Sequence, residues 1–274
     1  MENSSETSIG AASLRAVHQI IDPGPKIFDD PVIVQLLGAD IIAHLKNREG
    51  EFFDVRTMAL RSHIVLRSRY TEDCLKEAFN RGVRQYMILG AGLDTFGYRR
   101  PDWAHEIKII EADHPASQAR KIELLNNANI TAPSNVSYTT IDFEKDDLST
   151  LLNVIDKNQP VFLSLLGVMV YLSEHAVDKI FAFIASLAKG SEFVFTYSQK
   201  ESESQMKFFA ERAAAAGEPW IRWFTPETLV NKLQEHGLSS ISFLDPATAQ
   251  KLYYSQDGTV LPAPRRGSLV RVQI

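Results

Sequence analysis

The chain is poor in cysteine: Cys74 is the only one among its 274 residues. A single cysteine cannot form an internal disulfide, and scarce cysteine is typical of proteins from a reducing compartment. Cys74 lies in the stretch 70–79, whose pattern predicts the buried face of a helix, so we expect it to pack rather than to act as a nucleophile. We therefore expect a cytoplasmic protein.

Long apolar runs and an excess of basic charge are also missing. The longest apolar run, residues 161–172, is too short to span a bilayer and instead predicts a central buried strand. The formal net charge is −5, whereas surfaces that bind nucleic acids favour clustered lysine and arginine. We therefore expect neither a membrane nor a nucleic acid as a partner.

Several catalytic signatures are absent as well. The chain has no H-E-x-x-H motif, no clustered cysteines and histidines, no G-x-S-x-G turn and no G-x-x-x-x-G-K-[S/T] loop. These absences argue against metal-dependent and hydrolytic functions. We expect no metal ion at the functional site.

The sequence does contain a regular alternation of apolar runs and helix-like stretches. Apolar runs at about 84–90, 107–112, 136–141, 160–166 and 191–197 alternate with helical patterns at 115–126, 146–156 and 173–189. Such alternation predicts an α/β fold with a mostly parallel sheet and crossover helices. Two further β-like runs, 239–244 and 267–274, close the chain. The length allows one large α/β domain.

Helical stretches lie on both sides of this alternation. Residues 1–10 are polar and are expected to lack regular structure, whereas 11–82 are predicted to be helical, with one helix starting at Asp30-Pro31 and another over about 54–80. Helices are also expected at 201–216 and from Thr225-Pro226 to Gly237. The expected organisation is a helical cover or lid, 1–82, over a single core, 83–274.

The most informative stretch is 85–95, where an apolar run ends in Gly90, Gly92 and Asp94. Two glycines after a strand allow a tight turn into a helix and close backbone approach to a ligand. In the dinucleotide pattern G-x-G-x-x-G a third glycine would occupy position 95, but Thr95 stands there. The missing glycine favours S-adenosylmethionine over NAD(P), although a turn that only packs a helix on a strand has a similar pattern.

Acidic residues follow the next two strands. Asp113 is expected to accept hydrogen bonds from the ribose hydroxyls of a nucleoside, with Glu111 as its competitor; either carboxylate could instead cap the helix that opens at Pro115. Asp142 is placed to accept from an adenine amino group, with Phe143 beside the ring. The alternative for Asp142 is an ordinary solvated acid at the end of a strand.

Three residues are candidates for the chemistry itself. Tyr171 follows the fourth strand and Tyr197 the fifth, and either could orient a nucleophile or only pack. His114 could act as a base, because the unperturbed pKa of histidine lies near neutrality, or it could simply start a helix. Helical segments 11–46 and the region 201–224 are expected to form the lid and an apolar acceptor pocket, with the aromatic residues Phe208, Phe209, Trp220, Trp223 and Phe224. For most of these aromatic residues, core packing is the alternative.

With these residues assembled, the chain resembles the leucine carboxyl methyltransferase-like family of S-adenosylmethionine-dependent methyltransferases, and more closely its bacterial and natural-product branch. The resemblance covers roughly residues 14–240 and is carried by F-D-D-P at 28–31, L-R-S-R-Y-T-E-D at 66–73, I-L-G-A-G-L-D-T at 88–95 with Tyr98 and Arg99, E-A-D-H-P at 111–115, G-V-M-V-Y-L at 167–172 and G-E-P-W at 217–220. The combination of L-G-A-G-x-D-T with E-x-D-x-P is far more specific than either glycine alone.

The resemblance implies a Rossmann-like, seven-stranded methyltransferase sheet with helices on both faces and a helical N-terminal cover. It implies that Arg67 pairs with the methionyl carboxylate of the cofactor, with Arg69 as the weaker candidate. It also implies that Gly90 lines the cofactor, that Asp113 holds the ribose, and that Asp142 with Phe143 holds the adenine. One residue departs from the pattern: the family commonly carries a glutamate before Gly167, and this chain has Leu166.

The sequence therefore predicts a methyltransferase that uses S-adenosylmethionine to methylate a small acceptor, most simply a carboxylate or hydroxyl oxygen in specialised metabolism. The alternatives are N- or C-methylation of a small aromatic acceptor, an NAD(P)-dependent oxidoreductase, and a non-catalytic nucleoside-binding protein. Leu166 bears on the acceptor more than on the cofactor.

Overall fold

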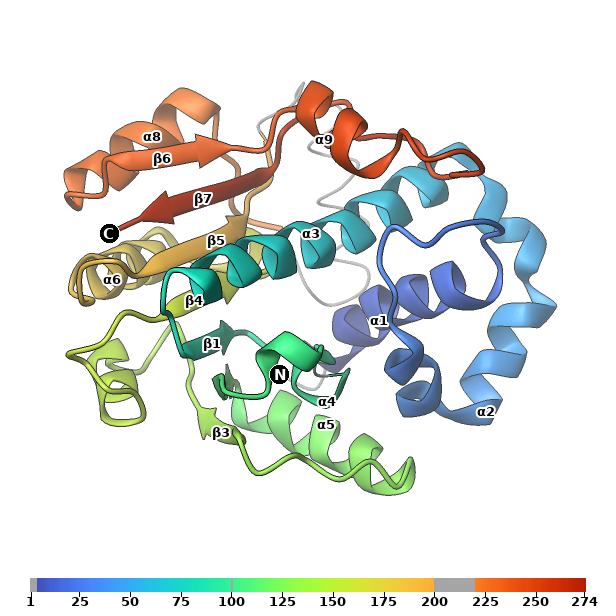
Figure 1. Ribbon diagram of the computed structural model, residues 1–274, viewed down its shortest axis with the longest axis horizontal. Coiled ribbons are helices and arrows are strands. Elements are labelled where there is room, and N and C mark those ends of the chain that lie inside the picture. Colours follow the sequence, from blue (N-terminus) through green and yellow to red (C-terminus); the bar gives the residue numbers. More distant parts are fainter. Residues whose placement is uncertain (1–3, 100, 200–219) are drawn as a thin grey trace.

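Seven strands form one sheet in a computed structural model of the chain, which describes residues 4–99, 101–199 and 220–274 (Figure 1). The strands are β1 Gln85–Leu89, β2 Lys108–Asp113, β3 Val136–Thr140, β4 Phe162–Leu165, β5 Glu192–Thr196, β6 Ser240–Phe243 and β7 Leu269–Gln273. Their order is β3-β2-β1-β4-β5-β7-β6, with β1 to β5 parallel and β7 antiparallel to both of its neighbours. The expected mostly parallel sheet is confirmed.

Eight α-helices of the described residues surround the sheet. They are α1 Ser4–Ile20, α2 Pro31–Asn47, α3 Val55–Asn80, α4 Phe96–Arg99, α5 Pro115–Asn127, α6 Glu174–Ala185, α8 Pro226–Glu235 and α9 Pro246–Tyr253. Four 3₁₀-helices connect them: η1 Glu49–Phe53, η2 Asp102–Ala104, η3 Leu148–Asn153 and η4 Met169–Tyr171. None of the helices in this part of the chain is long and apolar enough to cross a membrane.

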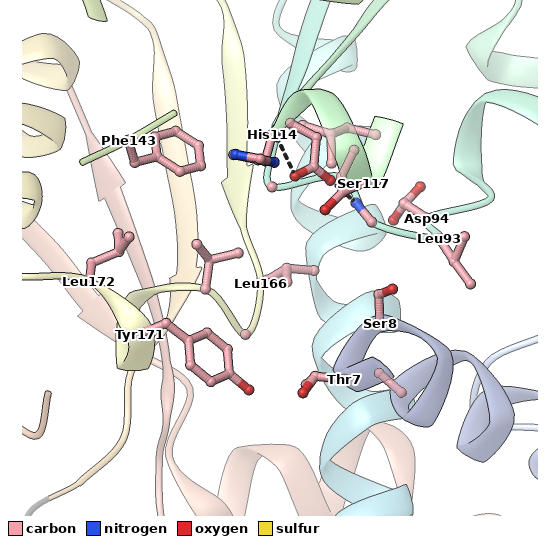
Figure 2. A pocket seen from close by; sticks show the side chains of 18 of the residues that line it. Thr7, Ser8, Leu93, Asp94, His114, Ser117, Phe143, Leu166, Tyr171 and Leu172 are labelled. Atoms are coloured by element: carbon pink, nitrogen blue, oxygen red, sulfur yellow. Dashed lines mark hydrogen bonds between the residues drawn. The ribbon is translucent and has the colours of Figure 1, made fainter. Parts of the chain in front are cut away.

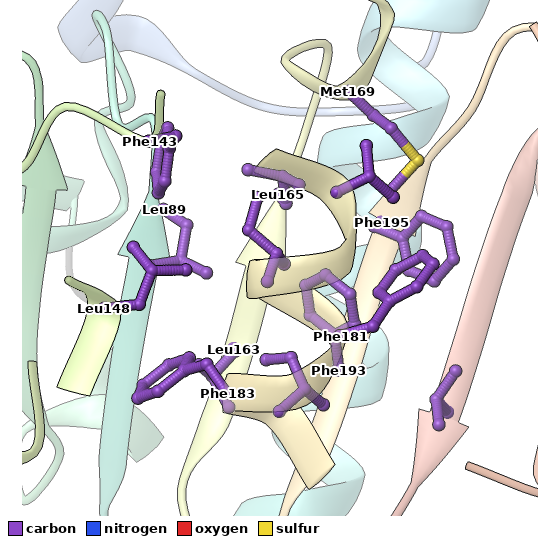
Figure 3. Packing of buried hydrophobic residues seen from close by; sticks show 14 of the residues in the cluster. Leu89, Phe143, Leu148, Leu163, Leu165, Met169, Phe181, Phe183, Phe193 and Phe195 are labelled. Atoms are coloured by element: carbon purple, nitrogen blue, oxygen red, sulfur yellow. The ribbon is translucent and has the colours of Figure 1, made fainter. Parts of the chain in front are cut away.

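Alternate residues of β1 point into two separate hydrophobic clusters, one on each face of the sheet. Met87 and Leu89 belong to the cluster that includes the buried residues of α6 and α8, and Tyr86 and Ile88 to the cluster formed with α3. Figure 3 shows the first cluster, where phenylalanines of α6 and β5 meet between helix and sheet. The central strands are buried on both faces, which explains their nearly continuous apolar sequence.

The structure differs from the expected helices in three places. Residues 4–10, expected to lack regular structure, belong to α1, because Ile9 packs against the cluster that joins α1 and α2. The stretch 146–156 forms only the short 3₁₀-helix η3, whose buried Leu148 and Leu151 recur at the three-residue period of that helix. Helix α9 was not expected; it begins at Pro246, and the Asp245 side chain caps it. The helix predicted at 201–216 lies outside the described residues.

A buried carboxylate, Asp30, ties the N-terminal helices to the glycine turn after β1. Asp30 is 0% exposed and caps α2 by accepting a hydrogen bond from the Ile33 amide at 3.2 Å. Its oxygens lie 3.2 Å from Arg15 Nη1 of α1 and 3.3 Å from Arg99 Nε of α4. The hydroxyl of buried Thr95 donates to the same carboxylate at 2.7 Å. Thr95, which stands where a third glycine was sought, therefore anchors the turn to α2.

A second buried ion pair joins α1 to α3. Arg61 donates to the two oxygens of Asp22 at 2.9 and 2.7 Å and to the Phe52 carbonyl at 2.8 Å. His18 Nδ1 lies 2.8 Å from the same carboxylate. Burial opposes charge on Asp22, but the hydrogen bonds with His18 and Arg61 outweigh it and lower the pKa of Asp22 below its ordinary value. Helices α1, α2 and α3 are thus fixed to one another by buried charges as well as by apolar packing.

We predict that Thr95→Val destabilises the protein more than Thr95→Ser. Valine keeps the volume but leaves the buried Asp30 carboxylate short of one donor, which costs about 1–3 kcal/mol. Serine keeps the donor and loses one buried methyl group, which costs about 1 kcal/mol. Denaturant unfolding of the three proteins measures the difference, and a valine variant at least as stable as the serine variant would contradict the role given to this hydroxyl.

Candidate active site

A cavity of about 390 Å³ opens at the carboxyl ends of the parallel strands. Its walls come from α1, α3, the β1–α4 turn, the segments that follow β2 and β3, and the β4–α6 loop. The predicted residues that line it are Arg67, Gly90, Gly92, Asp94, Asp113, His114, Asp142, Phe143 and Tyr171. Figure 2 shows His114 and Phe143 on one side of this cavity and Thr7 and Ser8 of α1 across from them.

The glycine turn needs both of its glycines. Gly90 and Gly92 have φ values of 65° and 47°, in the left-handed region that other residues seldom adopt. A Cβ atom at Gly90 would also collide with the Val168 side chain, so this glycine lets the β1–α4 turn touch the β4–α6 loop. The amide of Gly92 donates to the Asp113 carboxylate at 2.5 Å.

Asp113 is held by two backbone amides at the end of β2. Its Oδ2 accepts from Gly92 and its Oδ1 accepts from the His114 amide at 2.7 Å. Burial raises the pKa of Asp113, and these two hydrogen bonds oppose that effect. A carboxylate can accept about four hydrogen bonds, so the two oxygens retain capacity toward the cavity.

Glu111, the competitor of Asp113, does not line the cavity. Its Oε2 accepts from Lys121 Nζ of α5 at 2.5 Å, and both side chains are buried. Its Oε1 has no hydrogen-bond partner among the described residues. Glu111 therefore sits under α5, whereas Asp113 at the sheet edge faces the cavity.

His114 and Asp142 approach each other on the wall that follows β2 and β3. His114 Nδ1 accepts from the Ala116 amide at 3.3 Å, so the residue caps α5 while it lines the cavity, and Nε2 carries the hydrogen of the neutral ring. Nε2 lies 3.9 Å from Asp142 Oδ2. The hydrogen bond from Lys145, at 2.8 Å, lowers the pKa of Asp142 and keeps it ionised. Phe143 is 8% exposed and belongs to the hydrophobic cluster that includes the buried residues of α6 and α8.

Arg67 of α3 supplies positive charge to the opposite wall. No carboxylate of the described residues lies within ion-pair distance of its guanidinium, which fits beside Gly167: a Cβ atom there would lie 2.5 Å from Arg67 Nη1. Burial, with the nearby charge of Arg15, lowers the pKa of Arg67 to about 10, and it remains charged at neutral pH. The weaker candidate, Arg69, is exposed, pairs with Asp73 at 3.0 Å and does not line the cavity.

Helix α1 contributes cavity residues that sequence reasoning missed. Thr7, Ser8 and Arg15 all line the cavity. Arg15 is buried, pairs with Asp30 and donates to the Leu93 carbonyl of the glycine turn. A signal was present: Ser8, Ala11, Ala12 and Arg15 follow the i, i+3, i+4, i+7 spacing of one helix face. Because the stretch was expected to lack structure up to residue 10, that face was not recognised.

The β4–α6 loop supplies an apolar wall with one phenol. Leu166, Val168 and Leu172 line the cavity with Ile221, and Figure 2 shows the Tyr171 hydroxyl directed toward Thr7. Tyr197 lies outside the lining: it is 4% exposed, and its hydroxyl donates to the Gly267 carbonyl at 3.2 Å.

The aromatic residues expected in the acceptor pocket have different positions. Phe224 is buried in the core cluster and Trp220 and Trp223 are partly buried, whereas Phe208 and Phe209 lie outside the described residues. In the part of the chain that the structure describes, no three His, Cys, Asp or Glu side chains gather as metal ligands would.

Comparisons with known proteins agree with this geometry. Residues 8–185 match the family model described as leucine carboxyl methyltransferase. A Bacillus subtilis protein whose name places it among the S-adenosyl-L-methionine-dependent methyltransferases is 32% identical over 280 residues, covering 92% of each chain. A Mycobacterium marinum protein with a similar name is 31% identical over 206 residues, covering 72% of this chain and 66% of its own.

Two solved structures share the fold. A DUF574 family protein from Streptomyces avermitilis has a TM-score of 0.60 at 16% identity and covers 99% of both chains. A protein from Thermobifida fusca, titled as a methyltransferase, has a TM-score of 0.57 at 20% identity and covers 87% of this chain and 91% of its own. At these identities the two structures support only a shared fold.

The family match over residues 8–185 and the Bacillus subtilis relative carry the assignment. The chain belongs to the leucine carboxyl methyltransferase family and is an S-adenosylmethionine-dependent methyltransferase.

Proposed function

We propose that this enzyme transfers a methyl group to a carboxylate or hydroxyl oxygen of a small acceptor. One observation carries the proposal: the Arg67 guanidinium, without a carboxylate partner in the described chain, and the Asp113 carboxylate lie on walls of the same cavity. This pair of opposite charges complements two parts of S-adenosylmethionine, the methionyl carboxylate and the two ribose hydroxyls.

We assign the contacts of the cofactor by the chemistry of each wall. Arg67 would bind the methionyl carboxylate through its planar fork, and Gly90 and Gly92 would line the methionyl chain. Asp94 lines the same wall with a negative charge that suits the methionyl ammonium. Asp113 would accept from the ribose hydroxyls.

The adenine would lie on the wall that follows β3. There Asp142 would accept from the exocyclic amine, and the apolar ring of Phe143 would cover one purine face. His114 lines this wall as well, so its contact would be with the nucleoside as much as with the acceptor.

The residues of the chain would act mainly by alignment and by excluding water. When bound, S-adenosylmethionine supplies a methyl carbon already activated by the sulfonium. The cavity must then hold the acceptor oxygen in line with the bond to sulfur. A carboxylate acceptor is already anionic and needs no base, whereas a hydroxyl would need a base such as Tyr171 to take its proton. His114 suits that role poorly, because its unprotonated nitrogen, Nδ1, accepts from the Ala116 amide.

The aliphatic residues of the cavity wall bear on the polarity of the acceptor. Leu166, Val168, Leu172 and Ile221 offer aliphatic surface around the Tyr171 phenol, and Leu166 replaces the glutamate that the family resemblance leads one to expect. This wall supports an acceptor with an apolar body. An aromatic ring methylated on nitrogen or carbon would fit the same surface and is the alternative acceptor.

We also propose that residues 1–82 form a helical cover over a core of 83–274. Helix α1 places Thr7, Ser8 and Arg15 on the cavity wall, and the buried Asp30 and Asp22 pairs fix it to α2, α3 and the glycine turn. A cover held in this way would shield the reacting groups from water.

Asp113→Asn should weaken S-adenosylhomocysteine binding by about 10- to 100-fold, because the charged acceptor of the ribose hydroxyls is lost. Glu111→Gln is the matched comparison. It leaves Lys121 buried without its ion-pair partner, so it should lower the free energy of unfolding yet keep the affinity within about twofold. Calorimetry measures the affinity, and a loss for the Glu111 variant alone would reverse the ribose assignment.

Gly167→Ala should weaken the same binding by about 10-fold or more, because the new Cβ displaces the Arg67 guanidinium from its seat. Gly190→Ala is the control. Its φ of 90° imposes similar backbone strain, but the nearest atom to its Cβ is Pro160 Cβ at 3.6 Å, far from the cavity. Equal affinity of the two variants, measured by calorimetry, would show that Gly167 does not seat a ligand-binding arginine.

Product analysis with labelled S-adenosylmethionine and sets of small carboxylic acids, phenols and aromatic amines tests the acceptor. Mild alkali releases the label from a methyl ester and leaves a methyl ether or a methylated amine intact. Tyr171→Phe should reduce turnover by about 100-fold or more if the acceptor is a hydroxyl, and by only a few-fold if it is a carboxylate. Label on nitrogen or carbon favours the alternative, and binding without label on any of these acceptors would contradict an acceptor from these classes.

A further inference from the structure

Two loops that line the cavity are joined by one side chain, Glu144. Its Oε1 accepts from the Ser173 amide at 2.8 Å, and its Oε2 accepts from the Ser173 hydroxyl at 2.7 Å. Ser173 is the N-cap of α6, and its hydroxyl oxygen accepts in turn from the Ala176 amide at 3.1 Å. The carboxylate thus lies at the N-terminus of α6, where the helix dipole favours negative charge.

The residues just before each end of this contact face the cavity. Asp142 and Phe143 immediately precede Glu144, and Tyr171 and Leu172 immediately precede Ser173; these four line the cavity, and so does Glu144. The contact therefore fixes the wall assigned to adenine against the wall assigned to the acceptor. We call it the Glu144–Ser173 clamp.

The loop after β3 has a separate attachment to α6. Lys179 Nζ donates to the Glu144 carbonyl at 3.3 Å and to the Asp146 carbonyl at 2.9 Å. These bonds use backbone oxygens only, so they survive removal of the Glu144 carboxylate. We therefore expect a variant without the clamp to fold and to keep this loop near the helix.

We propose that Glu144 is a positioning residue that couples occupancy of the nucleoside wall to the placement of Tyr171. This rests on the proposed function, which assigns adenine to Asp142 and Phe143 and the acceptor to the Tyr171 wall. A nucleoside that orders Phe143 orders the adjacent Glu144, and the clamp passes that order to Ser173 and the end of η4. Because such coupling is reciprocal, an acceptor held by Tyr171 would equally strengthen nucleoside binding.

Amide hydrogen exchange with and without S-adenosylhomocysteine tests the clamp. In the wild type the ligand should slow exchange both at 142–144 and at 169–172. In Glu144→Ala the protection at 142–144 should remain, the protection at 169–172 should fall to background, and affinity should fall about threefold. Asp147→Ala is the control, because this exposed carboxylate of the same loop accepts only from Ser149 and does not touch the β4–α6 loop.

The outcomes separate the clamp from the proposed function. If the ligand protects neither loop of the wild type, the adenine assignment fails and the clamp proposal falls with it. If 169–172 remains protected in Glu144→Ala as in the wild type, the function stands and the clamp is overturned.

A double-mutant cycle with Ser173→Ala gives an independent check. That variant removes the hydroxyl that caps α6 and donates to Glu144 Oε2, but it leaves the Ser173 amide to donate to Oε1. The clamp predicts that Glu144→Ala weakens S-adenosylhomocysteine binding less in the Ser173→Ala background than in the wild type. Strictly additive losses would show that the two side chains act separately, and they would refute the coupling.

Discussion

The buried carboxylate of Asp30 is the contact on which the shape of the cavity depends. It collects two guanidinium groups, one hydroxyl and one amide from α1, α2, the glycine turn and α4. A buried charge of this kind is stable only while its partners stay in place, and loss of one partner typically costs about 3–5 kcal/mol. The N-terminal helices and the glycine turn are therefore held as one unit, and the cavity between them has a defined wall.

The charges along the cavity are separated by wall. Arg67 and Arg15 lie on the side of α3 and α1, whereas Asp113 and Asp142 lie at the ends of β2 and β3. Each charge is fixed by its surroundings: Arg15 by Asp30, Asp113 by two amides, and Asp142 by Lys145. Arg67 has no carboxylate within ion-pair distance in the described chain, and its guanidinium lies against Gly167. That asymmetry makes one end of the cavity the stronger anchor for an anionic group.

The sheet and much of the site could be predicted because local signals and long-range structure agree. Apolar runs located the seven strands, and the positions of acids after those strands located Asp113 and Asp142. Position at the strand end favoured Asp113 over Glu111, but spacing could not show that Glu111 is buried under α5 and paired with Lys121. Thr7 and Ser8 could not be located either: their stretch is polar, and only packing of α1 against α2 makes it a helix.

The course of α1 has a practical consequence for handling the protein. Thr7 lies in the cavity wall only three residues after Ser4, where the helix begins, which is about one helical turn. The other end of the chain follows β7, which runs antiparallel to β5 and so finishes at the edge of the sheet away from the cavity (Figure 1). A tag or surface tether joined ahead of α1 therefore starts about one helical turn from the cavity wall. The same attachment after Ile274 starts at the opposite ends of the strands.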